Sequence, residues 1–460
     1  MKNYLFILIL CLSLPGHAQE YSAIKGFVKG AKLKEVTLYK TVDGSIQACA
    51  TSRIGADGSF GFLLKPETGF YSIGGERLNF PVYLKGGEQV NIDLLETRAQ
   101  LNGKNSKENK TLYSWVDYAA NIRLKAVFFE LTRSNYEDFF PEFETYVKGL
   151  EQLKSKLRSG NKAFDVILSD YVDYATDYYA IIFLHTPREK HPEKSMRPEY
   201  YSHIVSARKY TDDKVLQFPE GIKMLISYTS FAYNEDGKKY DVESYTDDCL
   251  SYLGNDRLKG EYVVNNSFRS FKSYDQYLNA MEKFGKYLVT PSLKMRAEAV
   301  GTKLYDTKAG GQAADFTYPD VDGKMVSLSD FKGKVVLVDV WATWCGPCRQ
   351  QIPYLKKLEE EMHGTDVVFG GVSVDESKDK QKWLDFIKTE GLKGVQLLAG
   401  GWSKITKDYK ITGIPRFMVF DKKGNIVSDF GMIGANAPRP SSPELKKMLE
   451  NEESRLKQIT

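Results

Sequence analysis

The stretch VVLVDVWATWCGPCR, residues 335–349, decides the fold of the C-terminal part of the chain. Its first seven residues are apolar and rich in branched side chains, with Asp339 as the exception, which predicts a short buried parallel strand. After Pro347, apolar residues recur three positions apart between charges, as they do in an amphipathic helix. Cys345 and Cys348 therefore lie where a strand passes into a helix.

The two cysteines enclose Gly346 and Pro347 and form a dithiol that can close and open reversibly. At a helix start, unpaired backbone N–H groups and the positive end of the helix dipole favour an anion, so a thiol in this place has a lowered pKa. We expect Cys345, at the edge of the turn, to be the attacking thiolate. Cys348 lies one helical turn further in and is expected to resolve the mixed disulfide.

Two other interpretations of the cysteine pair stay open, half of a zinc site and a structural disulfide. Zinc needs two further Cys or His ligands at local spacing, and the nearest histidine, His363, has no such companion. A structural bridge that closes so small a loop constrains the unfolded chain little. Redox chemistry is favoured over both, and neither a metal nor a cofactor is expected.

A second segment, ITGIPRFMVF at residues 411–420, has a proline entering an apolar strand, which suits a cis peptide bond. The polar turn DKKGN at residues 421–425 follows it, ahead of another strand. Together with residues 339–349, these motifs closely resemble the thioredoxin fold. The lead-in of residues 314–334 is similar to that of the exported TlpA and ResA branch. The resemblance covers residues 308–455.

The resemblance implies roles for the matching residues. Cys345 matches the nucleophile and Cys348 the resolving cysteine, and the two form the redox disulfide of the family. Pro415 matches the cis-proline that faces the dithiol. Ile414, just before it, matches the residue whose backbone pairs with an incoming substrate strand. The substrate-binding surface is expected to be completed by three residues beside the cysteines: Trp344, Gly346 and Pro347.

Asp339 matches the buried acid that accepts the proton of the resolving thiol in thioredoxins. Its chemistry favours the same role, because a carboxylic acid inside an apolar strand should have a raised pKa, which suits proton transfer near neutral pH. The alternative is an aspartate at a strand end that bonds to a neighbouring backbone group.

The chain also departs from its relatives at the site. Several ResA-like proteins carry Glu between their cysteines where this chain has Gly346, and other members carry Asn at the position of Asp339. Both differences favour a broad reductant. A peroxiredoxin, the closest rival on the same scaffold, needs Thr or Ser three residues and Pro seven residues before its cysteine, where this chain has Ala342 and Val338.

The first residues predict export from the cytoplasm. A short basic start precedes an apolar core at residues 4–14, which is too short to span a bilayer, and a small-x-small cleavage site ends at Ala18. Residues 1–18 are therefore expected to be a cleaved signal peptide, leaving a soluble protein of the periplasm or cell envelope. Cys11 lacks the small preceding residue that lipid attachment requires. An uncut membrane anchor is the alternative.

Few cysteines remain beyond the signal, which argues against a disulfide scaffold. Cys49 and Cys249 are expected to be small buried residues rather than a bridge. The 64 basic and 60 acidic residues are spread along the chain, so no nucleic-acid partner is expected.

Four regions follow the signal. Residues 19–100 contain short strands punctuated by glycine turns, which predicts a small β-sandwich; they resemble an uncharacterised β domain often fused ahead of exported thioredoxins. Residues 101–305 have helical periodicity. Residues 306–312 form a short glycine-containing linker that should let the redox domain reorient. Residues 313–455 complete a multidomain chain with an α/β thioredoxin fold.

The helical region contains four clear helices, with Ser134-Asn135 as a cap before the second: residues 105–132, 137–158, 163–185 and 274–288. Three tyrosines fall on one face of the third helix: Tyr171, Tyr174 and Tyr178. They could line a groove for a polypeptide or glycan, but packing against a neighbouring helix is the favoured interpretation. No metal site is expected at three histidines without ligand spacing: His185, His191 and His203.

The predicted function is that of a cell-envelope thiol-disulfide oxidoreductase, a protein-disulfide reductase in cytochrome c maturation or envelope disulfide homeostasis. Gly-Pro between the cysteines resembles thioredoxin, whose couple lies near ~ −270 mV, so reduction is the expected direction. The implied partners are disulfide-containing envelope proteins, including apocytochrome c, and a membrane thiol reductase of the DsbD or CcdA type as electron donor. The alternative is an envelope polypeptide- or glycan-binding protein with a regulatory or vestigial redox domain.

Overall fold

The computed structural model describes residues 21–206, 210–271, 273–305, 308, 310–430, 440 and 443–454. The chain divides into two compact units, Met1–Tyr262 and Val263–Thr460. The signal peptide expected at residues 1–18 lies outside the described residues, as does Cys11. Within the described part of the chain, no helix is both long and apolar enough to cross a membrane.

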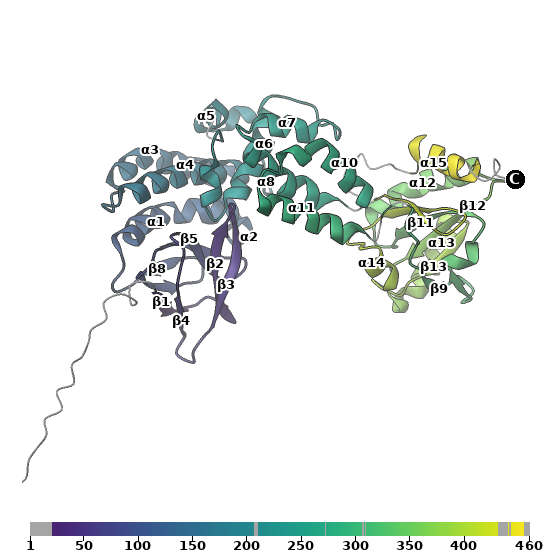
Figure 1. Cartoon of the computed structure of the whole chain (residues 1–460), viewed down its shortest axis with the longest axis horizontal. Coiled ribbons are helices and arrows are strands. Elements are labelled where there is room, and N and C mark those ends of the chain that lie inside the picture. Colours follow the sequence, from purple (N-terminus) through teal and green to yellow (C-terminus); the bar gives the residue numbers. More distant parts are fainter. Residues whose placement is uncertain are drawn as a thin grey trace, which may run out of the picture. The chain divides into compact units, whose positions relative to one another are not determined.

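The first unit begins with the predicted β-sandwich, drawn in purple in Figure 1. One sheet has the order β4-β1-β7-β8, formed by β1 (Ser22–Phe27), β4 (Ser59–Leu64), β7 (Gln89–Leu94) and β8 (Ala99–Leu101). The other has the order β3-β2-β5-β6, formed by β2 (Glu35–Val42), β3 (Ser45–Arg53), β5 (Gly69–Gly74) and β6 (Asn79–Leu84). Burial alternates along β1 and β4, as expected for strands with one face in a core.

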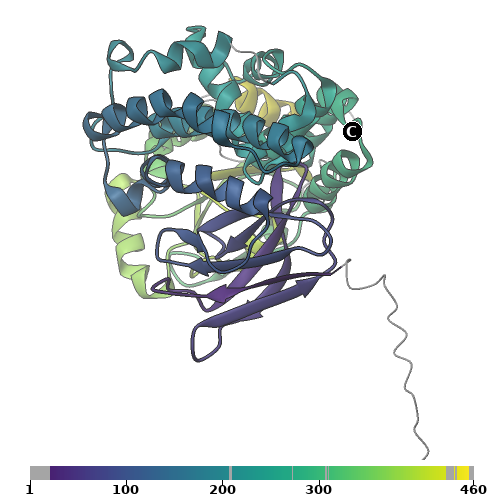
Figure 2. The ribbon, with the colours of Figure 1, turned by 90° about the vertical axis from the view of Figure 1, so that its left-hand side faces the viewer.

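Helices follow the strands and lie over them in both Figure 1 and Figure 2. The helical elements, with η for short 3-10 or π turns, are α1 (Lys107–Val127), α2 (Phe129–Thr132), α3 (Tyr136–Lys156), α4 (Lys162–His185), η1 (Lys194–Met196), α5 (Tyr200–Ser206), η2 (Asp213–Gln217), α6 (Gly221–Glu235), α7 (Tyr245–Ser251) and α8 (Asp256–Tyr262). Asn135 caps α3, because its side chain accepts from the backbone of Glu137 while Asp138 bonds back to the backbone of Asn135. The central helical region is thus confirmed.

Strands and helices of this unit share one aromatic core. Phe70 of β5 lies 5.1 Å from Tyr171 of α4, and Tyr83 of β6 lies 4.6 Å from Phe164, measured between ring centroids. Three tyrosines of α4 are all buried: Tyr171, Tyr174 and Tyr178. They therefore pack in the core rather than line an open groove. The sandwich and these helices form one unit, whereas the sequence places a boundary near residue 100.

The two remaining cysteines are both free. Cys249 is buried as expected, but the expectation of a buried Cys49 is wrong, since its side chain is exposed. Cys49 lies on β3, an edge strand of its sheet, where side chains of both faces are only partly covered. Its thiol donates to the carbonyl oxygen of Leu38 at 3.3 Å.

The second unit starts with helical segments and continues into an α/β domain. Its elements are η3 (Val263–Ser267), α9 (Phe268–Ser270), α10 (Tyr274–Phe284), η4 (Gly285–Tyr287), α11 (Pro291–Leu304), β9 (Thr317–Pro319), β10 (Met325–Ser327), η6 (Leu328–Phe331), β11 (Val335–Trp341), α12 (Gly346–Glu361), β12 (Val367–Ser373), η7 (Ser377–Asp379), α13 (Lys380–Glu390), β13 (Val395–Leu398), α14 (Lys404–Asp408), β14 (Arg416–Phe420), β15 (Ile426–Phe430) and α15 (Pro443–Ser454). The last described part of the predicted linker is fixed to this domain, since Gly310 N–H donates to the carbonyl of Ile426 at 2.7 Å.

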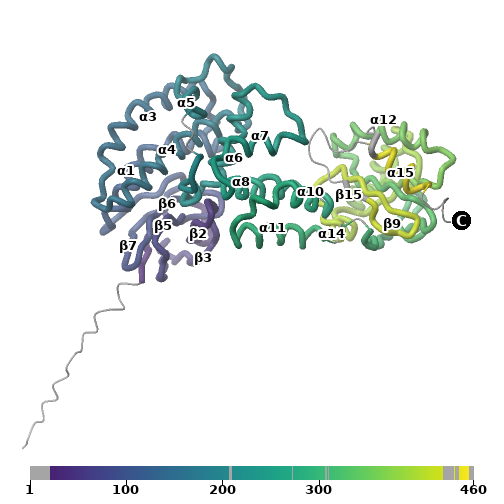
Figure 3. Tube along the Cα trace, turned by 45° about the horizontal axis from the view of Figure 1, so that its top comes forward, coloured from purple at the N-terminus to yellow at the C-terminus, as the bar shows by residue number. Residues whose placement is uncertain are grey.

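The five-stranded sheet of this domain has the order β13-β12-β11-β14-β15. β12 lies parallel to β11 on one side, and β14 lies antiparallel to it on the other. Every residue of β11 is buried, because α12 and α15 cover one face of the sheet and α13 covers the other. Figure 3 shows α12 and α15 close together in this domain. The predicted C-terminal thioredoxin fold is confirmed, and its central strand leads directly into the cysteine pair.

Candidate active site

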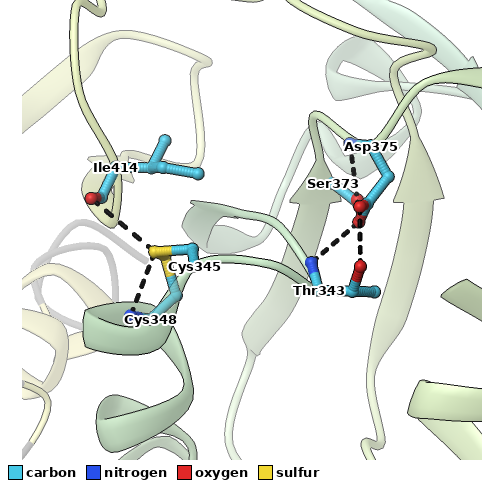
Figure 4. Close-up of a disulfide and its surroundings, with 6 residues drawn as sticks. All are labelled: Thr343, Cys345, Cys348, Ser373, Asp375 and Ile414. Atoms are coloured by element: carbon cyan, nitrogen blue, oxygen red, sulfur yellow. Dashed lines mark hydrogen bonds between the residues drawn. A yellow bond between two sulfur atoms is a disulfide. The ribbon is translucent and has the colours of Figure 1, made fainter.

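Cys345 and Cys348 form a disulfide at the start of α12, with an S–S distance of 1.95 Å (Figure 4). Cys345 is the N-cap residue of the helix, and its sulfur accepts from the backbone N–H of Cys348 at 3.1 Å. The first backbone N–H groups of a helix have no partners within the helix. The N–H of Cys348 would therefore also stabilise a thiolate on Cys345. Both side chains are buried.

A segment 69 residues further along the chain faces this disulfide. The Ile414–Pro415 peptide bond is cis, and the carbonyl oxygen of Ile414 lies 3.7 Å from the sulfur of Cys345 (Figure 4). Pro415 is buried and Ile414 is half-buried. The tertiary structure thus brings together the two motifs that the sequence separates.

The other residues predicted for the substrate surface lie on the open side of the cysteines. Trp344 is 56% exposed, and Gly346 and Pro347 are exposed as well. A Cβ built on Gly346 would meet no atom within 4 Å. The protein surface beside Cys345 is therefore open at Gly346.

Asp375 holds the loop before the cysteines, and the sequence analysis does not identify it. Its carboxylate accepts from the backbone N–H of Thr343 at 2.8 Å, the hydroxyl of Thr343 at 2.7 Å and the hydroxyl of Ser373 at 2.6 Å (Figure 4). The side chain is 1% exposed. Its position just after the apolar strand β12 is the available signal, because the carboxyl ends of parallel strands meet at one edge of a sheet.

Asp339 lies inside β11, opposite Gly371 of β12 and Phe417 of β14. It is 9% exposed, and its Oδ1 atom is buried without a hydrogen-bond partner. Burial raises the pKa of Asp339 to about 8. The position inside the strand and the unpartnered oxygen disagree with the alternative of an aspartate bonded at a strand end. Asp339 also lines a cavity of about 50 Å³ together with Cys348.

Among the described residues, no group of three or more His, Cys, Asp or Glu side chains is arranged to hold a metal ion. The chemistry that the site offers comes from sulfur: a bond that can open and close, a helix start beside one sulfur, and an acid in the cavity behind the other.

Known proteins share this domain. A family model described as Redoxin matches residues 308–444. The thiol-disulfide oxidoreductase ResA of Bacillus thuringiensis subsp. konkukian is 33% identical over 129 residues, which cover 28% of this chain and 72% of ResA. The thioredoxin-like protein YneN of Bacillus subtilis is 33% identical over 149 residues, 31% of this chain and 86% of YneN. The crystal structure of the thioredoxin domain of a thiol-disulfide oxidoreductase from Bacteroides vulgatus is 29% identical and covers 31% of this chain and 98% of that one, with a TM-score of 0.26.

The matched region contains the cysteine pair, the cis-proline and the sheet that supports them. The resemblance to exported thioredoxins is therefore confirmed for the C-terminal third. The chain belongs to the TlpA/ResA-like branch of the thioredoxin family, and its C-terminal domain is a thiol-disulfide oxidoreductase.

Proposed function

We propose that the protein is a protein-disulfide reductase of the cell envelope, which works through a mixed disulfide on Cys345. The observation that carries the proposal is the backbone of Ile414, held by cis-Pro415 with its carbonyl oxygen 3.7 Å from the sulfur of Cys345. Backbone groups beside a reactive sulfur suit an extended polypeptide, which can add to them as a strand.

The reduction proceeds in two exchanges. The thiolate of Cys345 attacks one sulfur of a client disulfide, the client S–S bond breaks, and the departing client thiolate takes a proton from solvent. Cys348 then attacks the sulfur of Cys345 while its proton passes to the carboxylate of Asp339, and the second client thiolate leaves and takes a proton from solvent. One electron pair moves from the dithiol to the client, which ends as two thiols, and the protein ends as the disulfide seen in the structure.

The direction of transfer and the partners are part of the same proposal. Gly-Pro between the cysteines favours a reducing couple, as in thioredoxin. In an oxidising compartment the protein then needs electrons from a membrane thiol reductase of the DsbD or CcdA type. Its clients are disulfide-containing envelope proteins, with apocytochrome c as one candidate. The apolar segment at residues 4–14 supports the location.

Insulin reduction with dithiothreitol as donor tests the activity on the full chain. We expect precipitation of the insulin B chain by the native protein and none by Cys345→Ser. An inactive native protein would overturn the proposal, as would a redox midpoint close to that of a strong oxidant, about −120 mV.

Trapping identifies the clients. In Cys348→Ala the mixed disulfide on Cys345 cannot be resolved, so client proteins should stay covalently attached. The double variant Cys345→Ser/Cys348→Ala is the matched control, because it differs from the trapping variant only in lacking the attacking sulfur. Capture of equal sets of proteins by both variants would contradict the mechanism.

The alternative of a polypeptide- or glycan-binding protein has no structural support in α4. Its three candidate tyrosines are buried, and Tyr171 donates to the carboxylate of Glu220 at 3.0 Å inside the core.

A further inference from the structure

A row of three residues crosses the sheet behind the cysteines. Asp339 of β11 is opposite Gly371 of β12, and Gly371 is opposite Gln396 of β13. Partners in a parallel register point to the same face of the sheet. The carboxyl of Asp339 and the amide of Gln396 therefore flank a position without a side chain.

Gly371 leaves the space that the amide of Gln396 occupies. A Cβ at that position would lie 2.3 Å from Oε1 of Gln396 and 3.0 Å from Nε1 of Trp341, so a side chain there would displace the Gln396 amide. The amide of Gln396 thus extends over the glycine toward Asp339. Its Nε2 donates to the carbonyl oxygen of Lys393 at 2.8 Å, which fixes the orientation of the amide.

Two oxygen atoms in this row lack hydrogen-bond partners. Oδ1 of Asp339 and Oε1 of Gln396 are both buried and unbonded within the described protein. A buried polar atom without a hydrogen-bond partner destabilises the fold, so a polar partner is expected between them. The cavity of about 50 Å³ is lined by both residues and has room for water, since one water needs only about 10–15 Å³.

The cavity also reaches charged groups. Besides Asp339, its titratable lining residues are Cys348, Lys356 and Glu359 from α12 and Lys393, just before β13. β12 contributes only Phe369, Gly370 and Gly371, and the β14 neighbour of Asp339 is Phe417. Glu359 is half-buried; burial raises its pKa, and Lys393 opposes that rise. Glu359 is therefore the carboxylate that can exchange protons between the cavity and solvent.

We propose that the cavity is a hydrated proton route for the resolving thiol, in which water held between Asp339 and Gln396 connects Asp339 with Glu359. This inference rests on the proposed function. The proton of the Cys348 thiol moves to the carboxylate of Asp339 as Cys348 attacks Cys345. The water then carries a proton from Asp339 to the carboxylate of Glu359, which releases it to solvent. The carboxylate of Asp339 is restored, and no proton is left in the core.

The test uses dithiobis(nitrobenzoate) as the disulfide and the full reduced chain in stopped flow, with Cys49→Ser in every protein compared, because the exposed thiol of Cys49 would also release coloured thiolate. Attack by Cys345 releases one coloured thiolate in a first phase, and attack by Cys348 releases another in a second phase. Only the second phase needs the proton route. Gln396→Leu keeps a similar volume and removes the amide, and Glu359→Gln removes the proton-exchanging group. Glu360→Gln is the matched control, an exposed neighbour on the same helix.

We expect Gln396→Leu to slow the second phase about 10-fold at pH 7 and Glu359→Gln to slow it about threefold, with the first phase unchanged. In native protein the second phase should rise with pH as Asp339 loses its proton. Gln396→Leu should move that rise to higher pH, because loss of water disfavours the carboxylate of Asp339 further. Glu360→Gln should match the native protein.

Unchanged second phases and pH profiles in both variants would overturn the proton route. Equal slowing of both phases would assign Gln396 a purely structural role and would overturn it as well. Failure of the native protein to release any thiolate would instead overturn the proposed function, so the two ideas fail in different ways.

Discussion

Two buried aspartates, Asp375 and Asp339, lie near the cysteine pair in different parts of the sheet. Their hydrogen-bonding surroundings differ. Asp375, at the edge of the sheet, accepts three hydrogen bonds from Thr343 and Ser373. Asp339, inside β11, has a buried oxygen that accepts none. Donors surround the carboxylate of Asp375, whereas Oδ1 of Asp339 has no donor within the described protein, so burial alone does not determine the state of a buried carboxyl group.

The largest expected difference between them concerns stability against pH. The pKa of Asp339 is about 8 in the folded protein, whereas an unfolded aspartate loses its proton near pH ~4. The folded state thus binds more protons in this window, so the free energy of unfolding falls as pH rises from about 4 to 8, by up to about 1.4 kcal/mol per pH unit.

Asp339→Asn should remove this pH dependence of the free energy of unfolding. The difference in stability between the variant and the native protein, in favour of the variant, should be largest at pH 8. Hydrogen exchange of peptides from β11 in the full chain measures it. If protection of β11 in the native protein stays constant from pH 5 to 8, after correction for intrinsic exchange, Asp339 does not make stability depend on pH.

Asp375→Asn should destabilise the C-terminal domain by about 3 kcal/mol, because an amide nitrogen would face the N–H or hydroxyl donors that the carboxylate now satisfies. Both phases of thiolate release should slow together. Urea unfolding of the full chain, with hydrogen exchange in β11 and β12 as the probe, measures the change.

Asp385→Asn, at an exposed position on α13, is the control for this loss. A selective effect of Asp375→Asn on the second phase would mean that Asp375 also handles a proton.

Asp339→Asn should slow the second phase of thiolate release about 10²-fold at pH 7, equivalent to about 2.7 kcal/mol in activation free energy, and leave the first phase intact. The reason is that an amide cannot accept the proton of Cys348. Stopped-flow release from dithiobis(nitrobenzoate) separates the phases. An unaffected second phase would show that the thiol of Cys348 loses its proton elsewhere.

Thr343→Val should cost the least, about 1 kcal/mol of stability, because it removes one hydroxyl donor to Asp375 and keeps the backbone N–H donor. Thr343→Ser, which retains the hydroxyl group, should behave like the native protein. The two variants are compared by the urea midpoint of the C-terminal domain. Equal urea midpoints would mean that the hydrogen bond from the backbone N–H of Thr343 to Asp375 fixes the loop without help from the hydroxyl group.

Much of the fold follows from local patterns in the sequence. The strand, turn and helix around Cys345, the start of α3 at Asn135 and the alternating strands of the sandwich depend on neighbours along the chain. Such features follow from side-chain periodicity and capping chemistry. The burial of Asp339 was also predictable, because a single acid stands in an otherwise apolar strand.

The tertiary structure decided what depends on contacts between distant segments. Asp375 reaches Thr343 only because β11 and β12 end side by side, and Gln396 reaches over Gly371 only because β13 joins next to β12. The exposure of Cys49 follows from its strand being at an edge. Strand order and register set these distances, and neither is encoded in any short stretch of the chain. The sequence by itself determined the dithiol and the buried acid Asp339. The packing of the strands decided that Asp375 fixes the loop before the dithiol and that Gln396 lies beside Asp339.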